Sequence, residues 1–89
     1  MTRADRIHAA LTTRFAPTLL RVEDDSALHA GHAGATPEGE THYTVTLESA
    51  AFAGLNRVAR TRLVNDALAP EFASGLHALA LKLSAPPDA

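Results

Sequence analysis

The sequence predicts an α+β domain with a three-stranded mixed sheet and helices packed on one face of the sheet, in the order helix, strand, strand, helix, strand. Apolar residues recur every three or four positions in two segments and at alternate positions in three others, which indicates two helices and three strands. A chain of 89 residues with 46% apolar residues can bury one modest core. Residues 1–89 are therefore expected to form one domain, with 84–89 as an extended or disordered tail.

The first helix is predicted between a capping sequence and a proline. Thr2 and Asp5 can satisfy free backbone donors at its start, and Pro17 stops it. Apolar residues between them lie along one helical stripe: Ile7, Ala10, Leu11 and Phe15.

Two strands follow, and a loop joins them. In the first strand, Leu20 and Val22 alternate with charged residues, which is the pattern of a half-buried strand. In the second strand the apolar residues that alternate with polar ones are Tyr43, Val45 and Leu47. Two successive strands joined by a loop are expected to pair antiparallel.

The connector between these strands, residues 24–43, is rich in glycine and alanine. It carries His29 and His32, and His42 lies near its far end. A connection this long in a small domain usually binds something or stays disordered. The connector is therefore the first candidate for a functional segment.

The second half of the chain contains the other helix and the last strand. Phe52 is expected to anchor the core ahead of a helix over residues 55–68, and Pro70 ends that helix or turns it into a short turn through Phe72. Gly75 then leads into residues 76–83, where large and small apolar residues alternate and favour a strand. A connection through a helix permits parallel pairing of this strand with the hairpin.

Composition excludes several classes of function. The formal charge of −2 gives no global attraction for nucleic acid or anionic membranes. The chain has no cysteine, so any soft-metal ligation must come from its five histidines. No apolar run approaches the roughly 18 residues of a membrane span, and no signal peptide is recognisable. We expect a cytoplasmic protein without a membrane partner.

Four short motifs together resemble the BolA family: residues 26–29, 39–43, 52–54 and 76–81. Each motif is weak alone, but their order and spacing are specific and cover nearly the whole chain. The resemblance implies a fold like the class II KH domain, with the order α-β-β-α-β inferred above.

The resemblance also implies a function. It implies an adaptor in iron–sulfur cluster trafficking and iron regulation that forms a heterodimer with a monothiol glutaredoxin and shares a 2Fe-2S cluster with it. The family's ligand at the start of the last strand matches His77, and its loop ligand matches His29, with His32 as the alternative. His42 is expected to support the site as a hydrogen-bond partner. No cluster is expected in the isolated protein, since the other ligands are the partner's thiolates.

Simpler interpretations stay open for these histidines. His77 can be a histidine hydrogen-bonded to backbone, and His29 and His32 can be solvated loop residues. A zinc site made of His29, His32 and His42 fits by count but matches no known spacing. The glycines fit no phosphate-binding loop and Ser26 fits no catalytic triad, so no enzyme is predicted.

The second functional hypothesis is a DNA-binding transcriptional regulator, because some BolA-like proteins are regarded as such. Arg57, Arg60 and Arg62 would carry it, and the first two share a helical face. No matching GxxG clamp is found between the predicted helices, and Thr61 stands where many relatives have a histidine between two arginines. A weak homodimer of the cluster-free protein is a further alternative.

Overall fold

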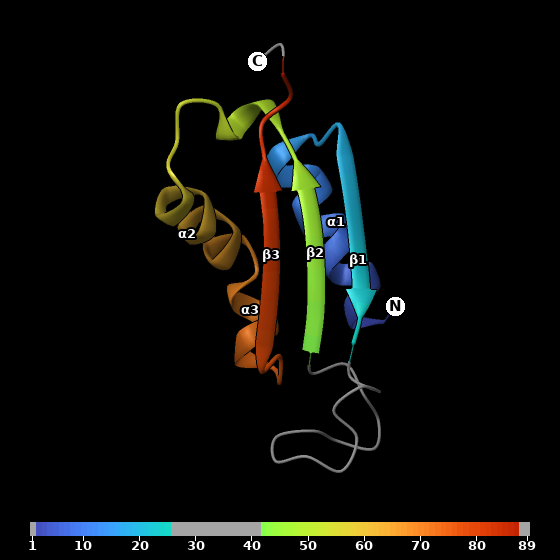
Figure 1. The fold of residues 1–89 in the computed structure, drawn as a ribbon. Coiled ribbons are helices and arrows are strands. Elements are labelled where there is room, and N and C mark those ends of the chain that lie inside the picture. Colours follow the sequence, from blue (N-terminus) through green and yellow to red (C-terminus); the bar gives the residue numbers. More distant parts are fainter. Residues whose placement is uncertain (1, 26–41, 88–89) are drawn as a thin grey trace.

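The computed structural model describes residues 2–25 and 42–87 (Figure 1). Its elements are α1 (Arg3–Phe15), β1 (Leu19–Asp24), β2 (His42–Glu48), the 3-10 turn η2 (Ala50–Phe52), α2 (Arg57–Ala67), α3 (Ala69–Ala73) and β3 (Ala78–Ser84). This order confirms the predicted α+β fold. The short helix α3 occupies the segment after the second helix in which a turn was expected, and Pro70 stands in its first turn, where a missing N–H costs no helical hydrogen bond.

The sheet has the strand order β1-β2-β3. β1 pairs antiparallel with β2, and β3 pairs parallel with β2, so the mixed sheet is confirmed. Val22, Val45 and Leu81 are register partners across the three strands. α1 lies behind the sheet, and α2 and α3 lie along the side of β3 (Figure 1). The chain between β2 and β3 passes through η2 and both of these helices, which supplies the crossover that parallel pairing requires.

The core lies between the helices and one face of the sheet. α1 buries Ile7, Leu11 and Phe15 of its predicted stripe in one cluster with alternate residues of β2, while Ala10 is half-buried. Phe52 is fully buried, as its role as an anchor requires. The Phe15 and Phe52 rings are 5.1 Å apart between centroids. The buried apolar residues are Ile7, Leu11, Phe15, Tyr43, Val45, Leu47, Phe52, Val64, Leu68 and Leu76.

The second helix starts later than predicted. α2 begins at Arg57 rather than at Leu55, because the Asn56 side chain accepts a hydrogen bond from the Ala59 N–H (2.8 Å) and so caps the helix. Gly54, with φ +77°, turns the chain immediately before this cap.

The last strand also has different limits. β3 begins at Ala78 rather than at residue 76, because Leu76 turns into the core, where it is 4% exposed, and its N–H donates to the Glu71 carbonyl (2.9 Å). The strand ends at Ser84, one residue into the predicted tail, since the Ser84 carbonyl accepts from the Ser49 N–H (3.0 Å).

Thr2 and Asp5 form the capping box expected at the start of α1. The Thr2 hydroxyl accepts from the Asp5 N–H (3.1 Å), and the Asp5 carboxylate accepts from the Thr2 N–H (3.0 Å). The hydrogen bond from the Thr2 backbone is the main reason why the pKa of Asp5 lies below its ordinary value of 3.8, and the Thr2 side chain lowers this pKa further. The charged carboxylate is therefore favoured in the folded state.

This capping box predicts a pH dependence of stability. Because the pKa of Asp5 is lower in the folded than in the unfolded chain, its contribution is complete above about pH 5 and is lost as the pH falls through the folded pKa. Asp5→Asn should therefore destabilise the protein near neutral pH, and the difference from the unmodified protein should shrink below about pH 4. Urea denaturation followed by circular dichroism at several pH values measures it. A difference that stays constant to the lowest pH would contradict the assignment.

A buried ionic network between α1 and α3 was not predicted from the sequence. Arg3 and Glu71 are each 8% exposed, and their Nη1 and Oε1 atoms are 2.9 Å apart. Arg6 Nη2 lies 3.1 Å from the same carboxylate oxygen. The Arg3 guanidinium also donates to the hydroxyl and the carbonyl of Ser74 (2.9 and 3.0 Å). The network thereby fixes the turn at Gly75, where φ is +126°, two residues before His77.

Candidate functional site

His77 lies at the end of the sheet where β2 and β3 begin and β1 ends (Figure 1). Its neighbour on one side is the buried Leu76, and on the other side is Ala78, the first residue of β3. The His77 side chain is exposed. A core residue and a strand therefore hold the backbone of an imidazole that remains accessible to a partner.

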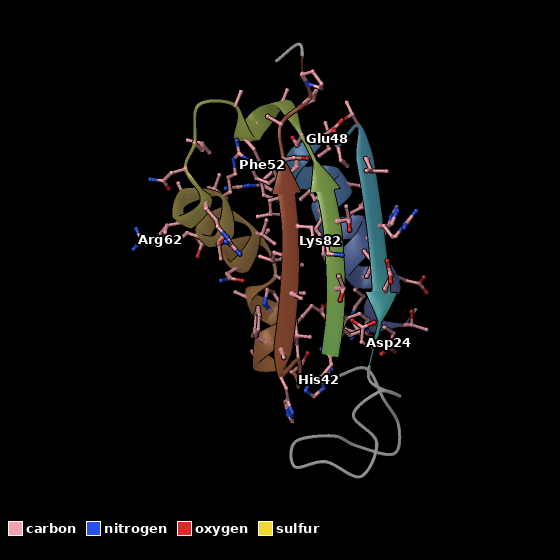
Figure 2. The ribbon with its side chains drawn as sticks, in the orientation of Figure 1. Asp24, His42, Glu48, Phe52, Arg62 and Lys82 are labelled. Carbon is pink, nitrogen blue, oxygen red and sulfur yellow. The ribbon has the colours of Figure 1, made fainter. Side chains whose placement is uncertain are left out.

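His42 lies next to His77. It is the first residue of β2, and its register partner is Ala78, so the parallel pairing brings the two histidines together. The ring centroids are 6.1 Å apart and the rings are nearly perpendicular. His42 is half-buried, and Figure 2 shows it at the start of β2. The structure thus brings His42 next to His77, while its expected role as a supporting hydrogen-bond partner stays a prediction.

Asp25 adds a carboxylate to the same corner. Its N–H donates to the His42 carbonyl (2.8 Å), and its carboxylate accepts a hydrogen bond from the Thr44 hydroxyl. A shallow depression of about 270 Å³ lies here between β2 and the start of β3. It is lined by Asp25, His42, Tyr43, Ala78, Leu79 and Ala80. Asp25 was not predicted to belong to this site, although its position at the start of the connector was a usable signal.

His29 and His32 lie outside the described residues. The connector that carries them leaves the sheet after Asp25 and returns at His42, and these two residues are hydrogen-bonded to each other. The position of His29 and His32 relative to His77 is therefore a prediction from the sequence alone.

Within residues 2–25 and 42–87, no group of three or more histidine or acidic side chains is arranged to hold a metal ion. Two imidazoles meet at this corner, and a neutral imidazole is a suitable ligand for iron. These two donors alone would not complete an iron site, so such a site would need further ligands from the connector or a second protein.

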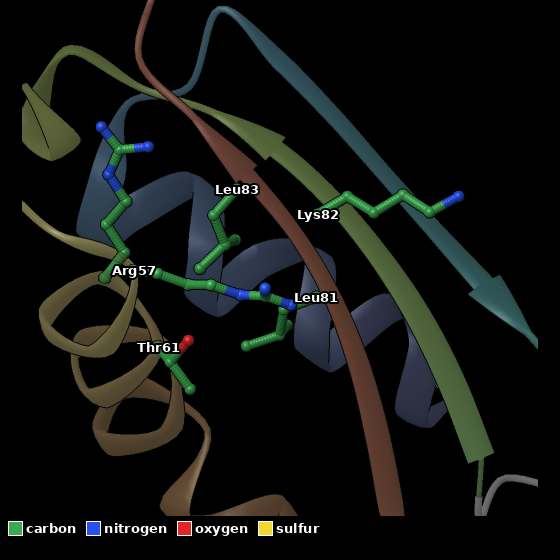
Figure 3. Close-up of a pocket in the computed structure, with 6 residues that line it drawn as sticks. Arg57, Thr61, Leu81, Lys82 and Leu83 are labelled. Carbon is green, nitrogen blue, oxygen red and sulfur yellow. The ribbon is translucent and has the colours of Figure 1, made fainter.

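The predicted arginine set is divided between two places. Arg57 and Arg60 line a cleft of about 360 Å³ between α2 and β3 (Figure 3). Arg62 points away from the sheet on the outer side of α2 (Figure 2). The shared face predicted for Arg57 and Arg60 is confirmed, but the three arginines do not form one surface.

The family model for BolA-like proteins matches residues 11–88. The chain belongs to the BolA-like family. This confirms the resemblance that the four sequence motifs indicated. The matched region contains both strands of the hairpin, the connector and His77, so the whole candidate site lies in the family's own part of the chain.

Several relatives of this BolA-like chain cover nearly all of it. A protein of Sinorhizobium sp, described as an uncharacterized protein in the cobS 5′ region, is 45% identical over 97% of this chain and 94% of its own length. The DNA-binding transcriptional regulator BolA of Vibrio cholerae is 45% identical over 86% of this chain and 69% of its own length.

One larger relative matches this chain over only part of its own length. The SufE-like protein 1 of Arabidopsis thaliana, described as chloroplastic/mitochondrial, is 42% identical over 97% of this chain, which spans only 24% of that protein. The solved structure of its BolA domain has a TM-score of 0.88 and 40% identity, and covers 100% of this chain and 98% of that domain. The architecture described above is therefore the BolA fold.

Proposed function

We propose that this BolA-like chain is a non-enzymatic adaptor in iron–sulfur cluster trafficking and iron regulation that forms a heterodimer with a monothiol glutaredoxin. In this heterodimer His77 and one connector histidine, His29 or His32, would ligate a 2Fe-2S cluster. The observation that supports it best is the exposed His77 at the corner where the connector begins and ends.

The chemistry of the chain agrees with a shared cluster. It has no cysteine, so thiolate ligands would come from the partner. One ligand on a rigid strand end and one on the connector would let the partner complete the site when it docks. His42, 6.1 Å from His77 between ring centroids, would limit the orientations of the His77 ring.

Replacing His77 tests this proposal directly. Titration of a cluster-loaded monothiol glutaredoxin with the unmodified chain should change the visible absorption and circular dichroism of the cluster, because imidazole replaces one of its ligands. His77→Ala should abolish most of that change. The matched control is His8→Ala on the exposed side of α1, which should leave the change intact.

A second set of variants tests the ligand that we propose on the connector of this chain. The double variant His29→Ala, His32→Ala should behave like His77→Ala, while His42→Ala should shift the spectrum without abolishing it. Spectral changes that survive in both His77→Ala and the double variant would show that these residues are not ligands.

A DNA-binding regulator is the second candidate, because the Vibrio cholerae relative carries that name. Arg57 and Arg60 lie together at the cleft beside β3. A protein that grips phosphates must lose affinity steeply as salt rises, so a titration with duplex DNA at several salt concentrations tests it. Absence of binding at low salt would reject this function.

The compartment remains a prediction. In the part of the chain that the structure describes, no helix has the length and apolar composition to cross a membrane.

A further inference from the structure

β3 forms one edge of the sheet. In a strand, the N–H and C=O of one residue point to the same side, and this side alternates along the chain. The Ser84 carbonyl bonds to β2 through Ser49 N–H (3.0 Å), and Leu79 is the register partner of Tyr43. The backbone groups that point to β2 therefore belong to Ala78, Ala80, Lys82 and Ser84. Those that point outward belong to Leu79, Leu81 and Leu83.

Leu81 and Leu83 both line a cleft beside this edge. This cleft, about 360 Å³ in volume, lies between β3 and α2 (Figure 3). It is lined by Arg57, Arg60, Thr61, Leu81, Lys82 and Leu83. The Lys82 side chain extends the other way, across the sheet over β2 (Figure 3). The cleft thus combines an edge of backbone donors and acceptors with a wall formed by one helix.

The helical wall is positively charged. Arg57 and Arg60 lie one turn apart, and the Arg60 Nε donates to the Phe52 carbonyl (3.2 Å), which holds that guanidinium near the cleft. Among residues 2–25 and 42–87, no acidic side chain lines the cleft. The two guanidinium groups therefore favour an anionic occupant.

We propose that this cleft binds an extended acidic peptide segment of a partner protein, which adds to β3 as a further strand. An edge strand offers alternating donors and acceptors that a second peptide backbone can match. A DNA phosphodiester backbone offers only acceptors, so donors to the Leu81 and Leu83 carbonyls would have to come from its bases. A peptide backbone supplies both donors and acceptors at the spacing of the strand, which favours a peptide.

The spacing of the arginines predicts where the acids lie in the peptide. Side chains on one face of a strand are about 6.6 Å apart, and helix positions three residues apart are separated by about 5–6 Å. Carboxylates at two alternate positions of the peptide can each meet one guanidinium. Leu81 and Leu83 lie toward the end of β3, whereas His77 precedes its start. The proposals for the peptide site and for the cluster site can therefore be tested separately, and one can be rejected without the other.

The test uses the full chain and a synthetic peptide of about eight residues, with glutamate at two alternate positions and valine or threonine elsewhere. Arg57→Glu should weaken binding about tenfold or more, since it replaces an attraction by a repulsion. Arg62→Glu is the matched control on the outer side of α2 and should change affinity less than about twofold. Fluorescence anisotropy of the labelled peptide measures both.

Hydrogen exchange of backbone amides tests whether the peptide binds along the edge of β3. The bound peptide should slow hydrogen exchange at the amides of Leu81 and Leu83, which gain acceptors, and should change little at Ala80 and Lys82, whose amides already bond to β2. Methylation of the peptide amides that face β3 should abolish binding, while methylation of the intervening amides should not.

Several results would overturn the proposal. One is equal binding of a peptide whose glutamates are replaced by lysine. Another is unchanged exchange at Leu81 and Leu83 when peptide is saturating. Protection of these amides by raising the protein concentration alone would assign the edge to a second copy of the chain, and displacement of the peptide by a tighter-binding single-stranded oligonucleotide would assign the cleft to nucleic acid.

Discussion

Glu71→Leu is expected to lower the free energy of unfolding by about 3 kcal/mol. The Glu71 carboxylate contacts both Arg3 and Arg6, and Arg3 is as buried as Glu71 itself. Removing the carboxylate leaves a guanidinium in a region of low polarity without this counter-charge, which costs far more than the loss of an exposed ion pair. Urea denaturation followed by circular dichroism at neutral pH measures the change.

Two further variants make this result interpretable. Glu48→Leu removes a carboxylate that accepts from the Thr18 hydroxyl (2.7 Å) at an exposed position, and should cost less than about 1 kcal/mol. The double variant Arg3→Met, Glu71→Leu removes the buried guanidinium together with the carboxylate and should recover part of the lost stability. If Glu71→Leu and Glu48→Leu lower the free energy of unfolding by equally small amounts, the buried network does not stabilise the fold.

Phe52→Ala is expected to cost about 3–5 kcal/mol. Phe52 is fully buried, and its ring contacts Phe15 at 5.1 Å between centroids, so the substitution removes apolar burial and leaves a cavity between α1 and the sheet. Thermal and urea denaturation of the isolated chain measure the loss.

Phe72→Ala is the matched control for this core substitution. Phe72 lies on α3 and is 38% exposed, so truncating it removes less burial and leaves no closed cavity. We expect a loss of about 1 kcal/mol or less. Equal losses for the two phenylalanines would mean that Phe52 does not anchor the core.

The features that could be predicted from the sequence are local ones. The stripe of α1 and the alternation in β2 repeat within a few residues, and the same face is buried in the structure in each case. The limits of α2 and β3 were less accurate, because the Asn56 cap and the burial of Leu76 depend on contacts that a hydrophobic pattern does not contain.

The buried pair of Arg3 and Glu71 could not be predicted in this way. The two residues are 68 positions apart, and each stands in a segment in which a charged residue ordinarily faces solvent. Only the packing of α3 against the start of α1 brings them together. Charged residues that depend on tertiary contacts of this kind leave no periodic signal.

The candidate site was predictable in part. The family resemblance indicated His77, but the contact between His77 and His42 follows from the register of β3 on β2, which alternation alone does not define. The ligand roles of His29 and His32 remain predictions, because those residues lie outside the described part of the chain.

β3 links two places that do not touch each other. His77 precedes its first residue, and the cleft beside α2 depends on its edge near Leu83. Local opening of β3 would separate His77 from His42 and would dismantle the cleft in the same event. A ligand bound at either place would reduce the population in which β3 is open, so the size of any coupling between the two places is set by that population.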